Sequence, residues 1–312
     1  MPLHQTSGRW RIGLALSLVT VFMWGVEPIA LTVALQALDV YTLTWFRFLV
    51  CFGLLGVYLA VRRQLPTPEK LRSTSLGLFA IAIIFLAINY VLFLKGLAQT
   101  SPSSGEVLIQ LAPVLMGLGA LAIFKERYTR RQVAGLGVLT LGFTFFFHDK
   151  LQTLIQAPTQ YLIGSSLIVV SAAAWAVYAL AQKQLLQKLP STNIMLIVYG
   201  VCAIIFSFFA DPQVILKLSP VQLGILIFCA FDSLIAYGAF AEALDHWEAS
   251  KISAVLPLSP LVTLISMQAL QLLAPTLIAP ERTTALGFLG AGLVVAGSMA
   301  IAVGKKDEVG DR

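Results

Sequence analysis

Two acidic side chains stand inside long apolar stretches of the sequence, where an ionised group is costly. Glu27 lies about midway along the first stretch, directly before Pro28, and Asp232 lies near the middle of a later one. A carboxylate at the centre of a bilayer costs on the order of 3 kcal/mol on insertion scales, so it needs a partner or a wet cavity. We predict that Glu27 binds a cationic group or carries a proton; a structural hydrogen bond is the alternative for both acids.

Aromatic and amide side chains in similar stretches extend this candidate site. Trp24 lies about one helical turn from Glu27, where its indole can stack on a cation or pack between helices. A few hydrogen-bonding groups in an otherwise apolar cavity orient a small amphiphilic solute. The predicted binding and cavity residues are Glu27, Trp24, Trp175, Tyr178, Asn89, Tyr90, Gln110, Asp232 and Tyr237.

Two prolines, Pro113 and Pro260, fall near the middle of apolar stretches that are each about 20 residues long. Proline removes an intrahelical hydrogen bond and clashes with the preceding turn, so it kinks a helix. Paired interruptions of this kind point to the binding site of membrane carriers. We predict that both act as hinges; passive kinks are the alternative.

Two further charged residues receive structural roles from their positions. Arg47 lies about a turn and a half into the second apolar stretch, where we expect it at interface depth and paired with a carboxylate or a helix C-terminus. Glu106 begins the fourth stretch, where a helix N-terminus favours negative charge. We expect Glu106 to cap that helix or to be solvated near the outer mouth, with a gating role as the alternative.

The composition indicates whether the chain lies in water or in lipid. Apolar residues make up 58% of the 312 residues and charged residues 12%, and the mean hydropathy is +0.86. Since a soluble domain carries about 25% charged residues, the chain is predicted to lie in lipid. Ten windows are long enough for membrane-spanning helices: roughly 12–35, 42–61, 74–97, 104–124, 132–148, 161–182, 193–210, 221–244, 252–273 and 285–303.

The basic residues indicate how these spans are oriented. Of the 21 Lys and Arg residues, 16 fall on the side of the N-terminus, four fall on the far side, and Arg47 lies within a span. The positive-inside rule then predicts ten spans with both termini in the cytoplasm. The net charge of +6 comes from short clusters between apolar runs rather than a basic face, so we expect no nucleic-acid partner.

A weak internal repeat divides the chain into residues 1–150 and 151–312. Segments 90–97 and 111–115 reappear at 237–244 and 258–262, both shifted by 147 residues. Trp24 matches Trp175 and Glu27 matches Tyr178 at a shift of 151. Five spans in each half place the second half in the opposite orientation, so the repeat is predicted to be inverted.

These motifs resemble the EamA branch of the drug/metabolite transporter superfamily. The resemblance rests on Trp24-Gly25, Thr44–Phe48, Tyr90 leading to Pro113, Glu126-Arg127 and the pair Gly135 and Gly142, and it covers about residues 12–303. It implies an all-α membrane protein of ten helices, forming two inverted five-helix repeats around a central cavity. Spans 1, 3, 4, 6, 8 and 9 would line the cavity, and spans 5 and 10 would be peripheral.

The resemblance also implies a secondary transporter that exports amino acids or related metabolites across the inner membrane of a bacterium. Its partners would be a small solute and the lipid bilayer, with proton coupling left open. The histidines His4, His148 and His246 are scattered, and zinc, nucleophile-elbow and Walker motifs are absent from the sequence. We therefore expect that the chain is not an enzyme and that it has neither a cofactor nor a metal site.

Two other functions remain as alternatives. A non-transporting assembly factor or sensor would need an exposed partner-binding module, yet the loops between the apolar stretches reach only about a dozen residues. A nucleotide-sugar exchanger with the same fold would need more deep positive charge to hold a diphosphate. The sequence leaves the substrate, the direction of transport and the oligomeric state open.

Overall fold

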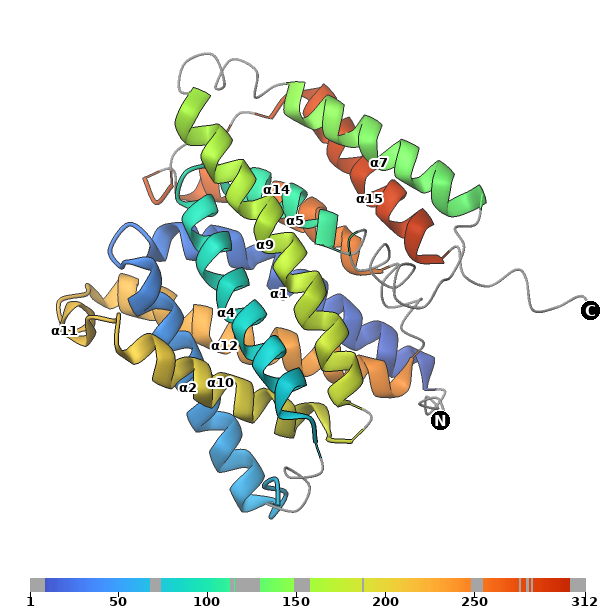
Figure 1. Ribbon diagram of the computed structural model, residues 1–312. Coiled ribbons are helices and arrows are strands. Elements are labelled where there is room, and N and C mark those ends of the chain that lie inside the picture. Colours follow the sequence, from blue (N-terminus) through green and yellow to red (C-terminus); the bar gives the residue numbers. More distant parts are fainter. Residues whose placement is uncertain are drawn as a thin grey trace, which may run out of the picture.

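The computed structural model of the chain is a bundle of helices (Figure 1). It describes residues 9–67, 74–112, 115, 130–148, 158–186, 188–247, 255–274, 276–278, 281 and 283–303, and these contain no β-strand. The helices are α1 (Trp10–Ala34), α2 (Val40–Val61), α4 (Leu76–Leu97), α5 (Pro102–Ile109), α7 (Arg130–His148), α9 (Pro158–Leu185), α10 (Ser191–Ser207), α11 (Pro212–Ile215), α12 (Pro220–His246), the 3-10 turn η1 (Leu256–Leu258), α14 (Ser259–Leu273) and α15 (Ala285–Val303).

Several helices begin at a polar side chain that satisfies a free backbone N–H group. Asp39 accepts hydrogen bonds from the backbone N–H groups of Tyr41 and Thr42 at the start of α2. At the start of α12, Ser219 and Gln222 cap each other's backbone in a reciprocal capping box. These local signals explain why the helices start close to the predicted positions.

Six helical segments are long and apolar enough to cross a membrane: 10–34, 40–61, 76–97, 159–182, 220–240 and 256–273. Three shorter apolar helices cover 133–148, 191–207 and 285–301. The chain is therefore an all-helical, multi-pass membrane protein. Most of the predicted fourth span, including Pro113, lies outside the described residues.

The predicted ninth span, 252–273, differs from a continuous helix with a proline at its middle. Here η1 is followed directly by α14, and Pro260 lies in the first turn of α14. Pro257 lies in the first turn of η1. Proline is favoured at a helix start because the missing N–H would have no intrahelical partner there, so two prolines three residues apart mark the break.

The two halves of the chain interleave in space. The main helix pairs are α1 with α12, α4 with α9, α2 with α10, and α7 with α15, and each joins one half to the other. In addition, α1 packs against α14 and α5 against α9. If each helix of the first half is exchanged with its counterpart in the second half, the same set of helix pairs results. The counterparts are α1 and α9, α2 and α10, α4 and α12, α5 and α14, and α7 and α15.

Glycines allow the backbones of paired helices to approach closely, as small residues do in membrane helices. In the antiparallel pair α7 and α15, which lie together at one edge of Figure 1, Gly135 packs against Gly297 and Gly142 against Gly290. A Cβ atom at Gly290 would collide with the backbone nitrogen of Phe146 and lie 2.8 Å from the carbonyl oxygen of Gly142.

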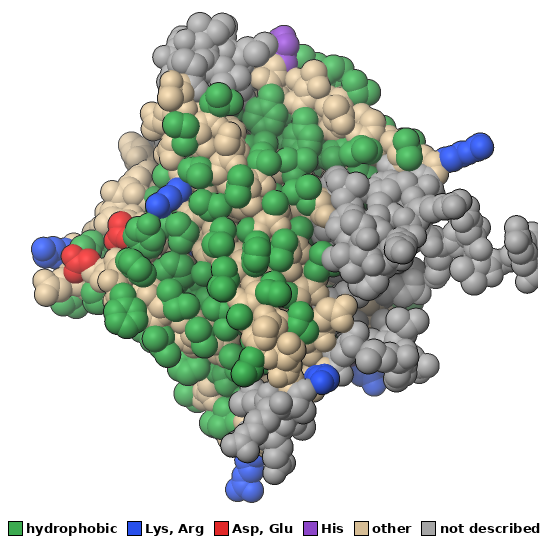
Figure 2. Space-filling model, viewed as in Figure 1, with side chains coloured by type: hydrophobic (Ala, Val, Ile, Leu, Met, Phe, Trp, Pro, Cys, Tyr) green, Lys and Arg blue, Asp and Glu red, His purple; other side chains and the backbone are tan. Residues whose placement is uncertain are grey.

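The outer surface of the bundle is apolar. Figure 2 shows a face covered largely by hydrophobic side chains, with charged side chains toward its margins. Large exposed side chains include Phe22 on α1, Val57 on α2 and Leu272 on α14. In a membrane this surface faces lipid, so it requires no protein partner.

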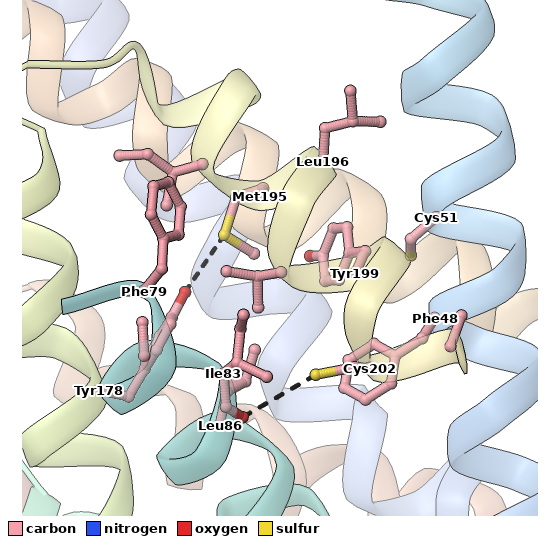
Figure 3. Close-up of a cluster of buried hydrophobic side chains, with 14 of the residues drawn as sticks. Phe48, Cys51, Phe79, Ile83, Leu86, Tyr178, Met195, Leu196, Tyr199 and Cys202 are labelled. Atoms are coloured by element: carbon pink, nitrogen blue, oxygen red, sulfur yellow. Dashed lines mark hydrogen bonds between the residues drawn. The ribbon is translucent and has the colours of Figure 1, made fainter. Parts of the chain in front are cut away.

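The largest buried cluster lies between α2, α4, α9 and α10 (Figure 3). Tyr178 is fully buried there, and its hydroxyl donates to the sulfur of Met195 at 3.2 Å. Cys202 contacts the carbonyl oxygen of Ile83 at 3.9 Å. The cluster packs α2 and α4 against α9 and α10.

The glycine contact yields a stability prediction. Gly290→Leu should destabilise the protein by about 1–3 kcal/mol because the added side chain forces α15 away from α7. Thermal unfolding of the purified protein in detergent measures the effect. Gly292→Leu on the same helix is the matched control, since a Cβ there meets no atom within 4 Å. Equal melting temperatures for the two variants would contradict the packing described here.

Candidate functional site

A cavity of about 130 Å³ lies where the helix pairs converge. A single water needs at least roughly 10–15 Å³ on the same measure, so the space suits a small solute. It is lined by parts of α1, α2, α4, α5, α9, α12, η1 and α14: Trp24, Glu27, Leu31, Arg47, Asn89, Tyr90, Phe93, Leu94, Glu106, Ile109, Gln110, Ala112, Trp175, Tyr237, Leu256 and Ser259. Apart from α2, these belong to the six spans that the resemblance implies.

An ion pair between Glu27 and Arg47 forms one wall of the cavity. One guanidinium nitrogen of Arg47 contacts Oε1 of Glu27, which joins α2 to α1. The same guanidinium group donates to the hydroxyl of Ser233 on α12 through Nη2 at 2.8 Å and Nε at 3.0 Å. Its carbon also lies 4.8 Å from the centre of the Tyr90 ring, within cation–π range.

Arg47 is therefore a cavity residue as well as a structural one. The prediction that it pairs with a carboxylate is confirmed, but it is only 2% exposed and faces the centre of the bundle. Its place in the cavity wall was not predicted from the sequence, and its expected interface depth stays a prediction. Ser233, which holds the guanidinium from α12, was not identified from the sequence at all.

A second polar group lies where α5 meets α14. The hydroxyl of Ser259 donates to Oε1 of Glu106, and the Gln110 amide donates to the Ser259 hydroxyl at 3.3 Å. Glu106 is 5% exposed and lines the cavity. The capping role expected for Glu106 is wrong, because Ser101 caps α5 through a hydrogen bond to the backbone of Ser104.

Aromatic rings supply most of the apolar wall. Trp24 packs edge-on against Tyr237 with ring centres 5.5 Å apart, which joins α1 to α12. Trp175 and Tyr90 line the cavity from α9 and α4. Asn89, beside Tyr90, donates to the backbone oxygen and hydroxyl of Ser171 at 3.0 and 2.9 Å, so its amide nitrogen ties α4 to α9.

The structure brings seven of the nine predicted site residues to this one cavity: Trp24, Glu27, Asn89, Tyr90, Gln110, Trp175 and Tyr237. The other two lie elsewhere. Tyr178 is in the hydrophobic cluster of Figure 3, outside the lining.

Asp232 is fully buried, and neither of its carboxyl oxygens has a hydrogen-bond partner in the described part of the chain. It lies near enough to Arg47 for a favourable electrostatic interaction.

The predicted hinge residues lie differently with respect to the cavity. Pro113 is outside the described residues, so its role stays a prediction. Pro260 directly follows Ser259, at the junction of η1 and α14, and Leu256 of η1 also lines the cavity. Nearby, Thr263 donates to the carbonyl oxygen of Gly25 at 2.6 Å and holds α14 against α1.

Comparison with known protein families gives a match that covers most of the chain. The EamA-like transporter family matches residues 11–147 and 162–303. This confirms the family that the sequence motifs indicate.

Individual relatives agree with this match. The chain is 38% identical over 296 residues to the "Uncharacterized inner membrane transporter YhbE" of Escherichia coli K12, covering 95% of this chain and 92% of that protein. It is 34% identical over 295 residues to an "Uncharacterized transporter" of Haemophilus influenzae, covering 95% and 96%. A "Probable amino-acid metabolite efflux pump" of Escherichia coli K12 is 25% identical over 296 residues, with 90% and 92% covered.

A solved crystal structure has the same fold. It aligns with a TM-score of 0.65 at 15% identity and covers 95% of this chain and 99% of the other. At this identity the likeness concerns the fold alone.

The ion pair yields a prediction about stability. Arg47→Ala or Glu27→Ala alone should cost about 3–5 kcal/mol, because each leaves a buried charge without its partner. The double variant should be clearly more stable than the sum of the two effects predicts. Unfolding in detergent measures all three, with Glu242→Gln as the control because its carboxylate is 59% exposed. Additive effects would contradict direct coupling between the two residues.

Proposed function

Because the chain belongs to the EamA-like transporter family, we propose that it is a secondary transporter that exports amino acids or related amphiphilic metabolites. The observation that carries this proposal is the central cavity, which combines acids, a base, amides and aromatic rings. Such a lining suits a small solute with both a charged and an apolar part. The name of the amino-acid metabolite efflux relative also supports this substrate class.

The proposed transmembrane arrangement is ten spans in two inverted repeats, residues 1–150 and 151–312, with both termini in the cytoplasm. The helix pairing supports it, since exchanging the two halves reproduces the main helix pairs. The two family-matched segments, 11–147 and 162–303, fall on either side of the boundary. The bias of basic residues supports the orientation, and the name of YhbE supports the inner membrane.

Alternating access would move groups of helices that each contain both halves of the chain. One group is α1, α12 and α14, and the other is α4, α5 and α9; the helices within each group pack together along α1 and α9, respectively. The cavity lies between the groups, so their relative motion would open it to one side at a time. One sequence half rocking against the other does not fit, because the tightest helix pairs join the two halves.

The break at η1 provides a place for this motion to begin. The backbone changes from a 3-10 turn to an α-helix between Leu258 and Ser259, beside the cavity. Pro260 prevents this junction from becoming one continuous hydrogen-bonded helix. We propose Pro260 as a hinge and Pro113 as its counterpart in the first half.

The transport proposal is tested with proteoliposomes preloaded with a panel of labelled amino acids. The wild type should release at least one of them faster than empty liposomes do, and Glu27→Gln and Gln110→Leu should each slow this release at least about tenfold. Glu242→Gln should release it at the wild-type rate. Size-exclusion profiles and melting temperatures verify folding. A change of rate with an imposed pH gradient distinguishes proton coupling from facilitated diffusion.

No release of any solute by the folded wild type, or normal release by both cavity variants, would count against the transport proposal.

The hinge proposal makes a separate prediction. Pro260→Ala restores a backbone N–H group and favours a continuous helix, so transport should slow several-fold while solute binding to the detergent-purified protein is unchanged. Release rates and equilibrium binding measure the two effects separately. Pro220→Ala is the matched control, because that proline also lies in the first turn of a helix, α12, but not beside a residue of the cavity lining. Loss of binding and transport together would assign Pro260 to the binding site instead.

A further inference from the structure

Glu106 is an acid of the cavity lining that pairs with no basic side chain among the described residues. Among the residues that the structure describes, its charged lining consists of Glu27, Arg47 and Glu106. Glu27 and Arg47 form an ion pair. Within the described part of the chain, Glu106 contacts Ser259 and forms no ion pair with a Lys, Arg or His. A buried acid in a membrane protein is ionised at little cost only beside a compensating charge, so a positively charged occupant of the cavity would stabilise the carboxylate of Glu106.

Burial disfavours the charged form of Glu106, and the hydrogen bond from Ser259 offsets part of this cost. The Gln110 amide donates to Ser259, and the Ser259 hydroxyl in turn donates to Oε1 of Glu106. Both hydrogen bonds are donated in the direction of the carboxylate. In a medium of low dielectric constant, linked hydrogen bonds polarise each other, so each strengthens the other. Oε2 makes no hydrogen bond within the described part of the chain, so it can accept one from a solute in the cavity.

We propose that Glu106 binds the ammonium group of the transported solute, with Ser259 and Gln110 as its positioning residues. This assignment rests on the proposed transport function and names the part of the cavity that recognises charge. An ammonium group there would place its hydrocarbon part near the aromatic wall, where Trp24, Trp175 and Tyr237 lie.

The location of Glu106 couples binding to the proposed motion. Glu106 and Gln110 belong to the group of α4, α5 and α9, whereas Ser259 begins α14 in the other group. The Ser259–Glu106 hydrogen bond therefore bridges the two groups at the η1 break. An ammonium group bound at Oε2 would share the carboxylate with this bridge, which gives the solute a direct effect on the contact between the groups.

The test uses three probes of similar size, n-butylammonium, n-butanol and n-butyrate, and the purified full chain in detergent. Isothermal calorimetry and tryptophan fluorescence measure binding, since Trp24 and Trp175 line the cavity. The wild type should bind n-butylammonium at least about tenfold more tightly than the other two. Glu106→Gln should weaken n-butylammonium binding about 10- to 100-fold, as expected for loss of a charged hydrogen bond, and leave n-butanol binding unchanged.

Two further variants control for structural effects. Glu106→Asp keeps the charge and should keep the preference for n-butylammonium, although with weaker binding. Glu242→Gln makes the same chemical change on a largely exposed carboxylate and should bind all three probes like the wild type. Melting temperatures show whether Glu106→Gln remains folded, which we expect because the amide can still accept the Ser259 hydrogen bond.

The outcomes separate this assignment from the transport proposal. A wild type without preference for n-butylammonium, or a folded Glu106→Gln variant that keeps the preference, overturns the Glu106 assignment even if amino acids are transported. Glu106-dependent n-butylammonium binding without transport of any solute would leave the site standing and overturn the transport function.

Discussion

The ion pair of Glu27 and Arg47 is the constraint to which the rest of the bundle conforms. Two charges buried in a membrane protein are tolerated only when each finds a partner and further hydrogen bonds. Here the guanidinium group contacts Glu27 on α1, Ser233 on α12 and the ring of Tyr90 on α4. Four helices must therefore meet at one point, and the cavity beside this point is the space that these contacts leave open.

The interleaved packing makes such a meeting point possible. Because α1 pairs with α12 and α4 with α9, the inner faces of both halves contribute to one small volume. Glycines permit the close approach: Gly25 packs against α14 near Val262, and Gly96 packs against α9 near Gly164. The pair α7 and α15 packs through its own glycines and contributes no residue to the cavity lining, so the site does not depend on it for chemistry.

The sequence predicts the helices well because their signals are local. The second apolar stretch, 42–61, corresponds to α2 at Val40–Val61, and the last one matches α15. The sequence does not predict which face of each helix points inward, because lipid-facing and core-facing sides are both apolar and leave little amphipathic signal. Asp232 and Tyr178 were thus assigned correctly to helices but lie outside the cavity lining. The partners of Arg47 and Glu106 are on other helices, which no spacing along one helix can reveal.

The repeat duplicates the framework of the cavity but only part of its chemistry. Trp24 and Trp175 match in sequence and both line the cavity, as do Tyr90 and Tyr237. Glu27 has a charge, whereas its counterpart Tyr178 packs in the hydrophobic cluster. Arg47 likewise projects from only one of the two matching helices, α2 and α10. A symmetric pair of charges would present two equivalent orientations to a solute, whereas the single ion pair and the separate Glu106 define one. The asymmetric placement of the charges therefore favours one orientation of a bound solute, which a symmetric framework alone cannot do.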